Sequence, residues 1–238
     1  MTTPISERIR TEFLEPRFQM LESAVVRRSI LEALKQVAPT LYGTVLDVGC
    51  GYKPYESLFL SAPSKATRYI GMDIGDNIYL GGQVDRIWDG RNIPLDNESV
   101  ECAVATEFLE HCDSPEAVLD EIFRVLKPGG LLFLTVPFLW PLHEVPHDMY
   151  RYTPFSLEAK LSAAGFSGIQ VSALGGVDAA MAIMIGLWIQ NLKSWHLRRI
   201  LSRLAVPVVR YLYRIDKKPQ VFAHMTMITG LAAVGRKA

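Results

Sequence analysis

Thr-Val-Leu-Asp-Val-Gly-Cys-Gly, residues 44–51, is the stretch that decides the fold of this 238-residue chain. Val45, Leu46 and Val48 favour a strand, and the apolar run stops at two glycines that bracket Cys50. Glycine accepts backbone conformations and allows a close approach that a side chain would block. The pattern therefore predicts a buried strand that ends at a ligand, although an ordinary strand followed by a glycine turn fits the same residues.

Strands alternate with helices along the rest of the chain, which indicates a doubly wound α/β sheet. Apolar runs predict strands at residues 44–48, 68–74, 83–88, 100–106, 131–136, 168–173 and 222–234. Helices are predicted at 55–60, at 114–126 with Ser114 as N-cap, at 157–164, and at 5–38 with a break near Pro16. We expect one domain over residues 1–238, divided into a helical cover (1–38), a core (39–177), a helical insertion (178–218) and the last strand (219–238).

Composition and charge limit the class of protein. Lys and Arg together number 25, as do Asp and Glu, so the net charge does not predict a nucleic-acid partner. Cys50, Cys102 and Cys112 lack CxxC spacing, so neither a disulfide framework nor a structural zinc cluster is expected. The sequence begins with polar residues rather than a signal peptide, and its longest apolar run, 179–189, is too short for a membrane-spanning helix. We expect a cytoplasmic protein.

Residues 179–214 are rich in apolar side chains and also carry a series of basic ones. We expect one or two helices there, broken at Pro207. One role for this segment is peripheral contact with a membrane, in which apolar side chains enter the surface and arginines meet anionic head groups. The other is a cap over the substrate or a homodimer contact with an exposed basic face. The basic residues are Lys193, Arg198, Arg199, Arg203, Arg210 and Arg214.

Acids and glycines follow the predicted strands at one edge of the sheet. In an open parallel sheet, the ligand crevice lies at the carboxyl ends of the strands. Asp47, Asp73 and Asp89 lie at the ends of the first three strands, and Thr106 and Glu107 end the fourth. A carboxylate has two oxygens in one plane, which suits Asp73 to a ribose diol. Asp73 also fits an N-cap or turn acid, and Asp89 also fits an Asp-Gly turn.

Together these residues resemble the class I S-adenosylmethionine-dependent methyltransferases, and within them the methyltransferase type 11 group. The resemblance covers residues 40–175 and the last strand. It is carried by VLDVGCG (45–51), Asp73, Asp89-Gly90, Leu109-Glu110-His111 and LKPGG (126–130). It implies a Rossmann-like sheet of seven strands, whose last strand, at 225–234, is antiparallel and lies beside the fifth. It also implies S-adenosylmethionine as the cofactor and S-adenosylhomocysteine as the product.

The resemblance further implies a cofactor-binding set. Gly49 and Gly51 would approach the methionine part of the cofactor, while Asp47 would support their loop and the cofactor's amino group. Asp73 would hold the ribose. Adenine would lie against Ile74 and Asp89-Gly90, and the methionyl end near Thr106 and Glu107. An NAD site fits less well, because Pro54 stands where the third glycine of G-x-G-x-x-G should be.

Residues 137–153 form a loop after the fifth strand, where they would overhang the transferred methyl group. A similar run, His-Glu-x-Pro followed by Asp and Arg-Tyr-Thr, occurs in methyltransferases of this group. The predicted catalytic residues are His143, His147 and Asp148, and the predicted substrate contacts are Trp140, Arg151 and Tyr152. Asp148 and Arg151 also fit an ion pair that only braces the loop.

Residues 143–147 also match the HExxH motif of zinc proteases, which belong to a different class of enzyme. That motif needs both histidines on one face of a helix. Pro146 disfavours such a helix, so a zinc hydrolase is a remote alternative and no metal is expected.

The predicted reaction is methyl transfer to a hydroxyl or amine of a small molecule, with glycans and lipid-linked metabolites among the candidate acceptors. Such an in-line displacement needs mainly proximity and alignment. A hydroxyl acceptor also needs a base, and His143 or His147 is suited to that role. DNA is not expected as a substrate, because residues 106–109 read TEFL rather than Asn/Asp-Pro-Pro-Tyr/Phe. A non-catalytic sensor or partner subunit that only binds the cofactor or a nucleoside stays open as an alternative.

Overall fold

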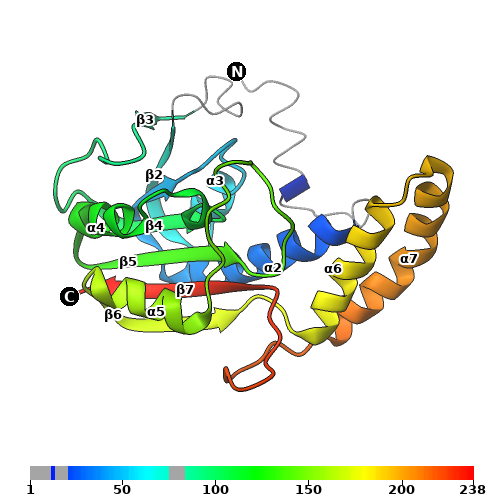
Figure 1. Ribbon diagram of the computed structural model, residues 1–238. Helices are drawn as coiled ribbons and strands as arrows, with labels where there is room; N and C mark the ends of the chain where they lie inside the picture. Colours follow the sequence, from blue (N-terminus) through cyan, green and yellow to red (C-terminus); the bar gives the residue numbers. More distant parts are fainter. Residues whose placement is uncertain (1–11, 14–20, 75–83) are drawn as a thin grey trace.

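The computed structural model describes residues 12–13, 21–74 and 84–238 and has a seven-stranded sheet at its centre (Figure 1). The strand order is β3-β2-β1-β4-β5-β7-β6. β7 pairs antiparallel with β5 and β6, and the other neighbouring strands pair in parallel. This confirms the predicted Rossmann-like sheet with its antiparallel last strand beside the fifth. The strands are β1 (Tyr42–Val48), β2 (Lys65–Ile74), β3 (Arg86–Trp88), β4 (Val100–Thr106), β5 (Leu126–Pro137), β6 (Phe166–Ala173) and β7 (Gly230–Lys237).

The carboxyl ends of the parallel strands meet at one edge of the sheet. Val48 of β1 lies opposite Met72 of β2, and Thr106 of β4 lies opposite Thr135 of β5. The residues that follow these positions are therefore neighbours in space although they are far apart in the sequence. This register brings the glycine loop and the acids of the second and fourth strands to the same edge.

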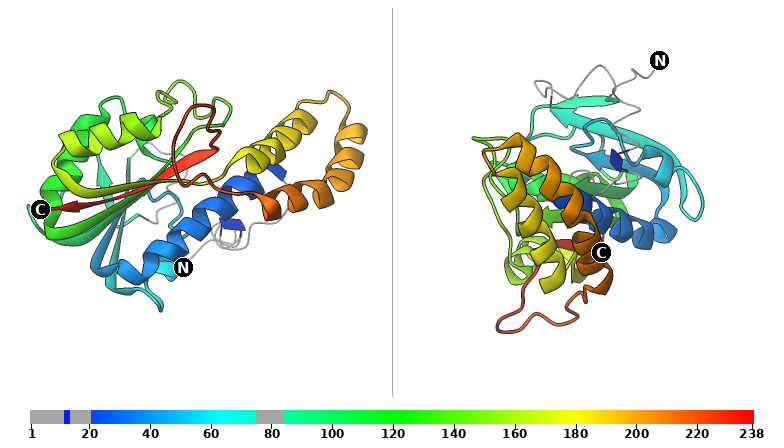
Figure 2. Two further views of the ribbon diagram at one scale, coloured as in Figure 1. Left: turned by 90° about the horizontal axis from the view of Figure 1, so that it is seen from below. Right: turned by 90° about the vertical axis from the view of Figure 1, so that its right-hand side faces the viewer.

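Helices cover both faces of the sheet. Successive side chains of a strand point to opposite faces, and apolar side chains on both faces are buried beneath helices. Leu46 and Val48 belong to the core on one face, and Val45 belongs to the core on the other. α4 (Pro115–Val125) and α5 (Pro154–Ala163) pack on the first face. α2 (Leu21–Val37) and the short α3 (Glu56–Phe59) pack on the second (Figure 2). Two 3-10 turns, η1 (Ala38–Thr40) and η2 (Leu109–His111), complete the elements that surround the sheet.

A helical hairpin of α6 (Val177–Gln190) and α7 (Trp195–Ile215) projects from one side of the sheet (Figure 1). It packs against α2 through a third apolar cluster that includes Val25, Ile183 and Val209. The predicted break at Pro207 is wrong, because Pro207 lies inside α7 and the helices separate at residues 191–194 instead. A proline inside a helix costs about 3 kcal/mol. Fully buried Val209 and its apolar neighbours in α7 pack against α2 and α6, and this packing opposes the cost.

Other boundaries also differ from the predictions. β7 begins at Gly230 rather than at residue 222, because residues 223–226 form a turn in which the Thr226 hydroxyl accepts a hydrogen bond from the Ala223 amide. β5 begins directly at Leu126, so it starts earlier than the predicted strand at 131–136 and includes the LKPGG run (126–130). Ser114 occupies the N-cap of α4 but makes no capping hydrogen bond with its side chain. Of the predicted helix at 5–38, α2 is confirmed, whereas the break at Pro16 lies outside the described residues, as does the start of the third strand at residue 83.

No helix in the described part of the chain is long and apolar enough to cross a membrane.

Candidate cofactor and acceptor site

The glycine loop is anchored to β2 and is open on its outer side. The amides of Gly49 and Cys50 both donate to the Met72 carbonyl, at 2.9 and 3.1 Å. Gly49 has φ +73°, and a Cβ atom there would lie 2.3 Å from the Phe108 ring. Gly51 has φ +49°, and no atom of the described residues lies within 4 Å of the position that its Cβ would take. The backbone at Gly51 is therefore accessible to a ligand that approaches closely.

Asp73 connects this loop to the end of β2. Its carboxylate is 4% exposed and accepts the Gly51 amide at 2.7 Å and the Ile74 amide at 2.8 Å. Ile74 is 42% exposed, and the position of a Cβ on Gly90 lies 3.9 Å from its side chain. The structure thus brings together Gly51, Asp73, Ile74 and Gly90, which the sequence assigned to a single ligand.

Asp89 closes the turn after β3. Its carboxylate accepts hydrogen bonds from the amides of Arg91 and Asn92, at 2.8 and 2.7 Å, and from the Asn92 side chain at 3.1 Å. These bonds stabilise the ionised form and lower the pKa of Asp89 to about 2. The side chain acts as a turn acid in this structure, and its contact with adenine stays a prediction.

Asp47 lies beneath the glycine loop rather than at its surface. Its side chain is 1% exposed and accepts the Tyr69 hydroxyl at 2.6 Å, and burial raises its pKa to about 7. Its other oxygen has no hydrogen-bond partner among the described residues. Asp47 therefore supports β1 and β2 from inside the core, and the predicted contact with the cofactor's amino group finds no support in this geometry.

Asp47→Asn is expected to reduce the pH dependence of stability. Between about pH 4 and pH 7 the folded Asp47 keeps its proton while an unfolded aspartate loses it. The free energy of unfolding therefore falls as the pH rises through this window, by at most about 1.4 kcal/mol per pH unit, and this contribution is absent in the variant. Urea unfolding at about pH 4 and about pH 8 measures it. An unchanged pH dependence in Asp47→Asn would contradict the assignment.

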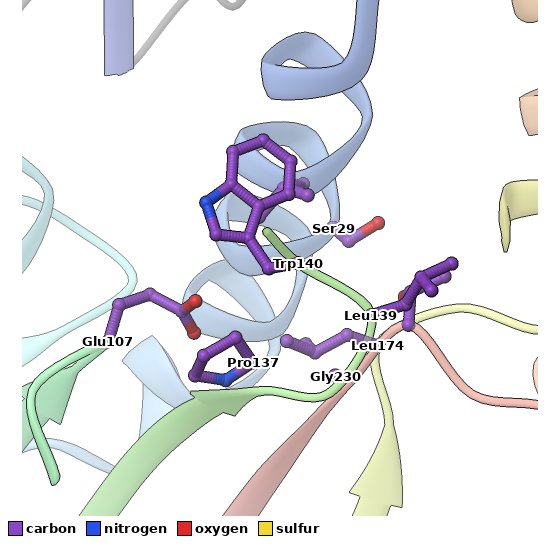
Figure 3. Close-up of a pocket in the computed structure, with 9 residues that line it drawn as sticks. Ser29, Glu107, Pro137, Leu139, Trp140, Leu174 and Gly230 are labelled. Atoms are coloured by element: carbon purple, nitrogen blue, oxygen red, sulfur yellow. The ribbon is translucent and has the colours of Figure 1, made fainter. Parts of the chain in front are cut away.

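Glu107, at the same edge of the sheet, lines a cavity. It follows Thr106, the last residue of β4, and has φ +49°. Its carboxylate accepts the Thr135 hydroxyl at 2.9 Å, and burial raises its pKa to about 7. Figure 3 shows Glu107 and Trp140 on the same cavity. The lining residues come from α2, β5, β7 and the connecting loops and are Val26, Ser29, Glu107, Pro137, Leu139, Trp140, Leu174, Thr229 and Gly230.

The loop at 137–153 is held by a central ion pair. Arg151 donates two hydrogen bonds to Asp148, at 2.6 and 2.8 Å, and one to the Trp140 carbonyl at 3.3 Å. Asp148 also accepts the His143 amide at 3.1 Å, and its paired, buried carboxylate has a pKa well below the ordinary range. Asp148 and Arg151 therefore brace the loop, which was the alternative to their predicted catalytic and substrate-binding roles.

The other predicted loop residues divide into exposed and buried ones. His143 is half-buried and His147 exposed, and residues 138–153 contain no helix, so the HExxH match lacks the helix that a zinc protease requires. Trp140 lines the same cavity as Glu107.

Tyr152 is 2% exposed and donates its hydroxyl to the Leu109 carbonyl at 3.2 Å. Its ring fills the core beneath the loop, so this geometry gives no support to the predicted contact between Tyr152 and substrate, which stays a prediction.

Two charged residues near the site had no assigned role. Lys53 is 6% exposed and pairs with Asp85 at 2.5 Å, while Glu110 is fully buried beside His111. Glu110 belongs to Leu109-Glu110-His111, one of the motifs that carry the resemblance to methyltransferases. Nothing in the local sequence indicated that its carboxylate would be buried, because η2 is positioned by tertiary contacts with the loop at 137–153.

Comparisons with known proteins agree with this arrangement. A family model described as a methyltransferase domain matches residues 46–134. A malonyl-[acyl-carrier protein] O-methyltransferase of Alcanivorax borkumensis is 30% identical over 138 residues, which cover 53% of this chain and 45% of that protein. A ubiquinone/menaquinone biosynthesis C-methyltransferase of Syntrophotalea carbinolica is 27% identical over 203 residues, which cover 71% and 83%. The chain thus spans less than half the length of the first of these relatives.

The solved structure of an S-adenosylmethionine-dependent methyltransferase from Archaeoglobus fulgidus has the same fold, with a TM-score of 0.55 at 16% identity over 97% of this chain and 99% of that one. The matched family model runs from β1 to β5 and so contains the glycine loop, Asp73 and Glu107. Residues 46–134 thus match a methyltransferase-domain family model, and the seven-stranded sheet with its antiparallel last strand is the fold of a solved S-adenosylmethionine-dependent methyltransferase, to which this chain is similar.

Proposed function

We propose that this protein binds S-adenosylmethionine at the carboxyl ends of β1, β2 and β4 and transfers its methyl group to a hydroxyl or amine of a small molecule. Glycans and lipid-linked metabolites are the candidate acceptors. The observation that carries the proposal is the convergence of open Gly51, the Asp73 carboxylate and exposed Ile74 at one edge of the sheet.

The residues at this edge fit the cofactor part by part. Asp73 would accept hydrogen bonds from the ribose hydroxyls through its carboxylate. Ile74 and the Asp89-Gly90 turn would bind adenine, and Gly49 and Gly51 would leave room for the methionine part. Thr106 and Glu107 would lie near its methionyl end. When bound, the cofactor supplies a methyl group on a positively charged sulfur, and the protein aligns the acceptor with it.

The cavity between Glu107 and Trp140 is the proposed acceptor site. A hydroxyl acceptor would need a base, and His143 and His147 are the candidates on the loop beside this cavity. An amine or an anionic acceptor would need none, and the same residues would then only shape the site. Asp148 would act by positioning His143, whose ring lies 3.2 Å from its carboxylate.

A two-stage experiment tests this function. Calorimetric titration with S-adenosylhomocysteine is expected to give binding at one site per chain. A labelled-methyl screen with cell extracts is then expected to label a small-molecule fraction. Failure of the wild-type protein to bind S-adenosylhomocysteine would overturn the proposal, whereas binding without transfer to any extract fraction would favour the non-catalytic sensor.

We further propose that the α6–α7 hairpin contacts an anionic membrane surface, which would bring a lipid-linked acceptor close to the site. The carrying observation is a second apolar stripe on α7, separate from the one that packs on α2 and α6. It recurs every three or four residues and is exposed: Leu197, Ile200, Leu204, Val208, Tyr211 and Ile215. Arg199, Arg203, Arg210 and Arg214 are spaced to lie along one side of this stripe, as in helices that bind at a membrane interface.

Replacing Ile200, Leu204 and Val208 with serine is expected to reduce binding to phosphatidylglycerol vesicles by about 10-fold or more, because each side chain loses apolar burial of about 1.5–3 kcal/mol at most. Sedimentation with vesicles measures the change. The matched control is Val221→Ser with Met225→Ser, two exposed apolar residues outside the hairpin. Equal binding of both variants would contradict membrane contact. A shift from dimer to monomer in the triple variant, without vesicle binding by wild type, would identify a homodimer contact instead.

A further inference from the structure

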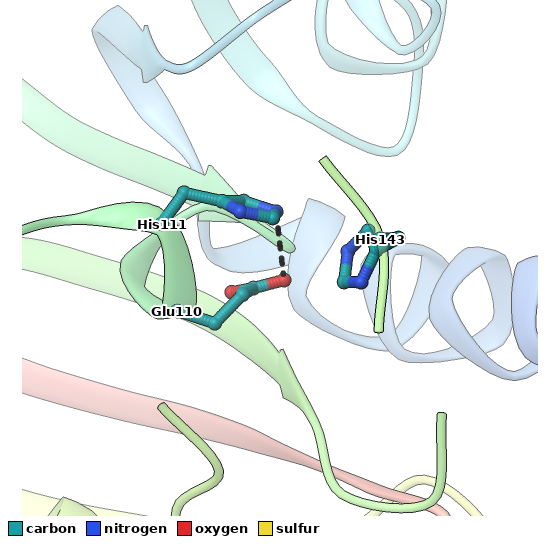
Figure 4. Close-up of side chains that lie close together, drawn as sticks. All are labelled: Glu110, His111 and His143. Atoms are coloured by element: carbon teal, nitrogen blue, oxygen red, sulfur yellow. Dashed lines mark ion pairs between the residues drawn. The ribbon is translucent and has the colours of Figure 1, made fainter. Parts of the chain in front are cut away.

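Glu110, His111 and His143 form a cluster in which one ligand atom from each lies within 4.8 Å of the others. Glu110 and His111 come from η2, after β4, and His143 comes from the loop after β5 (Figure 4). The rings of His111 and His143 lie edge to face at 4.8 Å between centroids. The cluster therefore joins two segments that are separated by more than a whole strand and helix in the sequence.

Glu110 supplies a buried carboxylate whose charge would be stabilised by a bound cation. Its side chain is fully buried, and neither carboxylate oxygen has a hydrogen bond within the described part of the chain. His111 Nε2 lies 3.7 Å from Oε1 of Glu110, which is too long for a hydrogen bond. A buried, unpaired carboxylate is unfavourable unless a cation or proton neutralises it. The 3.7 Å separation between this oxygen and the imidazole nitrogen is compatible with one ion bound to both at about 2.1 Å.

The two imidazoles are oriented so that each has one nitrogen beside an oxygen acceptor. His111 Nδ1 lies 3.2 Å from the His147 carbonyl, and His143 Nδ1 lies 3.2 Å from Asp148 Oδ2. The His147 carbonyl favours a proton on Nδ1 of His111 and leaves the Nε2 lone pair of His111 free to bind a ligand. Nδ1 of His143 is buried and makes no hydrogen bond within the described residues, although Asp148 lies beside it. Histidines that bind metals are usually oriented in this way by a carbonyl or carboxylate. Glu144 adds a further carboxylate oxygen 3.9 Å from His111 Nε2, on the exposed side of the cluster.

We propose that Glu110, His111 and His143 bind one divalent transition-metal ion, with Glu144 as an additional ligand. Two imidazoles and a carboxylate suit Zn²⁺, Co²⁺ or Mn²⁺ rather than Mg²⁺ or Ca²⁺, which prefer sets of oxygen ligands. This site differs from the HExxH match, because two of its ligands, Glu110 and His111, come from η2, and because His147, the second histidine of that motif, is not a ligand. If the proposed methyl transfer holds, a metal here would bind an oxygen of the acceptor and favour its deprotonation, and His143 would then act as a metal ligand and not as the base.

Metal binding is tested on the full chain after treatment with a chelator and does not depend on methyl transfer. Titration with Co²⁺, followed by visible absorption, and with Zn²⁺, followed by calorimetry, is expected to saturate at one ion per chain. Mg²⁺ is expected to give no such binding. Glu110→Gln, His111→Asn and His143→Asn are each expected to weaken Co²⁺ binding by about 10-fold or more.

His147→Asn is the matched control, since His147 lies on the same loop with an exposed side chain and contributes only its backbone carbonyl. It is expected to keep the wild-type affinity. Glu110→Gln keeps the shape of the side chain and removes a buried unpaired charge, so it stays informative if a histidine variant fails to fold. The proposal is overturned if wild type shows no saturable binding of Co²⁺ or Zn²⁺, or if Glu110→Gln and His143→Asn bind Co²⁺ as tightly as wild type.

Discussion

Asp73→Ala is expected to weaken binding of S-adenosylhomocysteine by about 100-fold or more. The variant would lose the hydrogen bonds to the ribose hydroxyls, and hydrogen bonds to a charged group contribute about 1.5–3 kcal/mol each. It would also release the amide of Gly51, which Asp73 holds at 2.7 Å, so the glycine loop would lose its attachment to the end of β2. Two such bonds correspond to roughly 100-fold or more in the dissociation constant, which calorimetric titration measures directly.

Asp120→Ala provides the control, because Asp120 is an exposed acid on α4, on the helical layer rather than at the sheet edge. It is expected to bind as wild type does. Thermal unfolding of both variants separates loss of the site from loss of the fold. A folded Asp73→Ala protein that binds S-adenosylhomocysteine with wild-type affinity would show that the ribose is held elsewhere, and the proposed cofactor site would then be wrong.

The sheet was predictable because its central strands contain stretches that are buried on both faces and are mostly apolar. Val45, Leu46 and Val48 are each buried, although they face opposite sides of the sheet. The predicted limits of the fourth strand, Val100 and Thr106, agree with the structure for the same reason. The acid at the end of the second strand was predictable from its spacing to the glycines, since one βαβ unit fixes that interval.

The features that sequence reasoning missed depend on contacts between distant segments. Pro207 is a strong local signal for a helix break, yet α7 continues because its inner face packs against α2 and α6. Tyr152 reads as a loop residue, but its hydroxyl reaches the Leu109 carbonyl and its ring is buried. The position of Glu110 depends on the path of the loop at 137–153, whose Met149 amide donates to the Glu110 carbonyl. No periodicity or short motif carries such information.

Removing the Asp148–Arg151 pair, which holds the loop at 137–153, is expected to lower the free energy of unfolding. The larger decrease is expected in Arg151→Met. That variant would leave Asp148, whose side chain is 1% exposed, as a buried charge without its guanidinium partner. Breaking a buried ion pair in this way costs about 3–5 kcal/mol. Asp148→Ala would leave Arg151, which is 25% exposed and can reach water, so its cost is expected to be smaller, about 2 kcal/mol. Urea unfolding measures both free energies.

The double variant gives the interaction free energy between Asp148 and Arg151, because a double-mutant cycle cancels the effects that each side chain has on its own. It is expected to lose less stability than the sum of the single variants, since neither charge is then left alone. Glu116→Ala, which breaks the more exposed pair with Lys160, serves as the comparison and is expected to cost at most about 1 kcal/mol.

The pH dependence gives an independent measurement of the same pair. The folded pKa of Asp148 lies well below that of an unfolded aspartate, so its contribution is complete above about pH 4 and is lost as the pH falls towards the folded value. Wild type should therefore lose more stability than Asp148→Ala when the pH falls below about 4. Additive single variants together with an unchanged acid dependence would show that Asp148 and Arg151 do not act as a unit, and the loop would then have to be held by its backbone contacts alone.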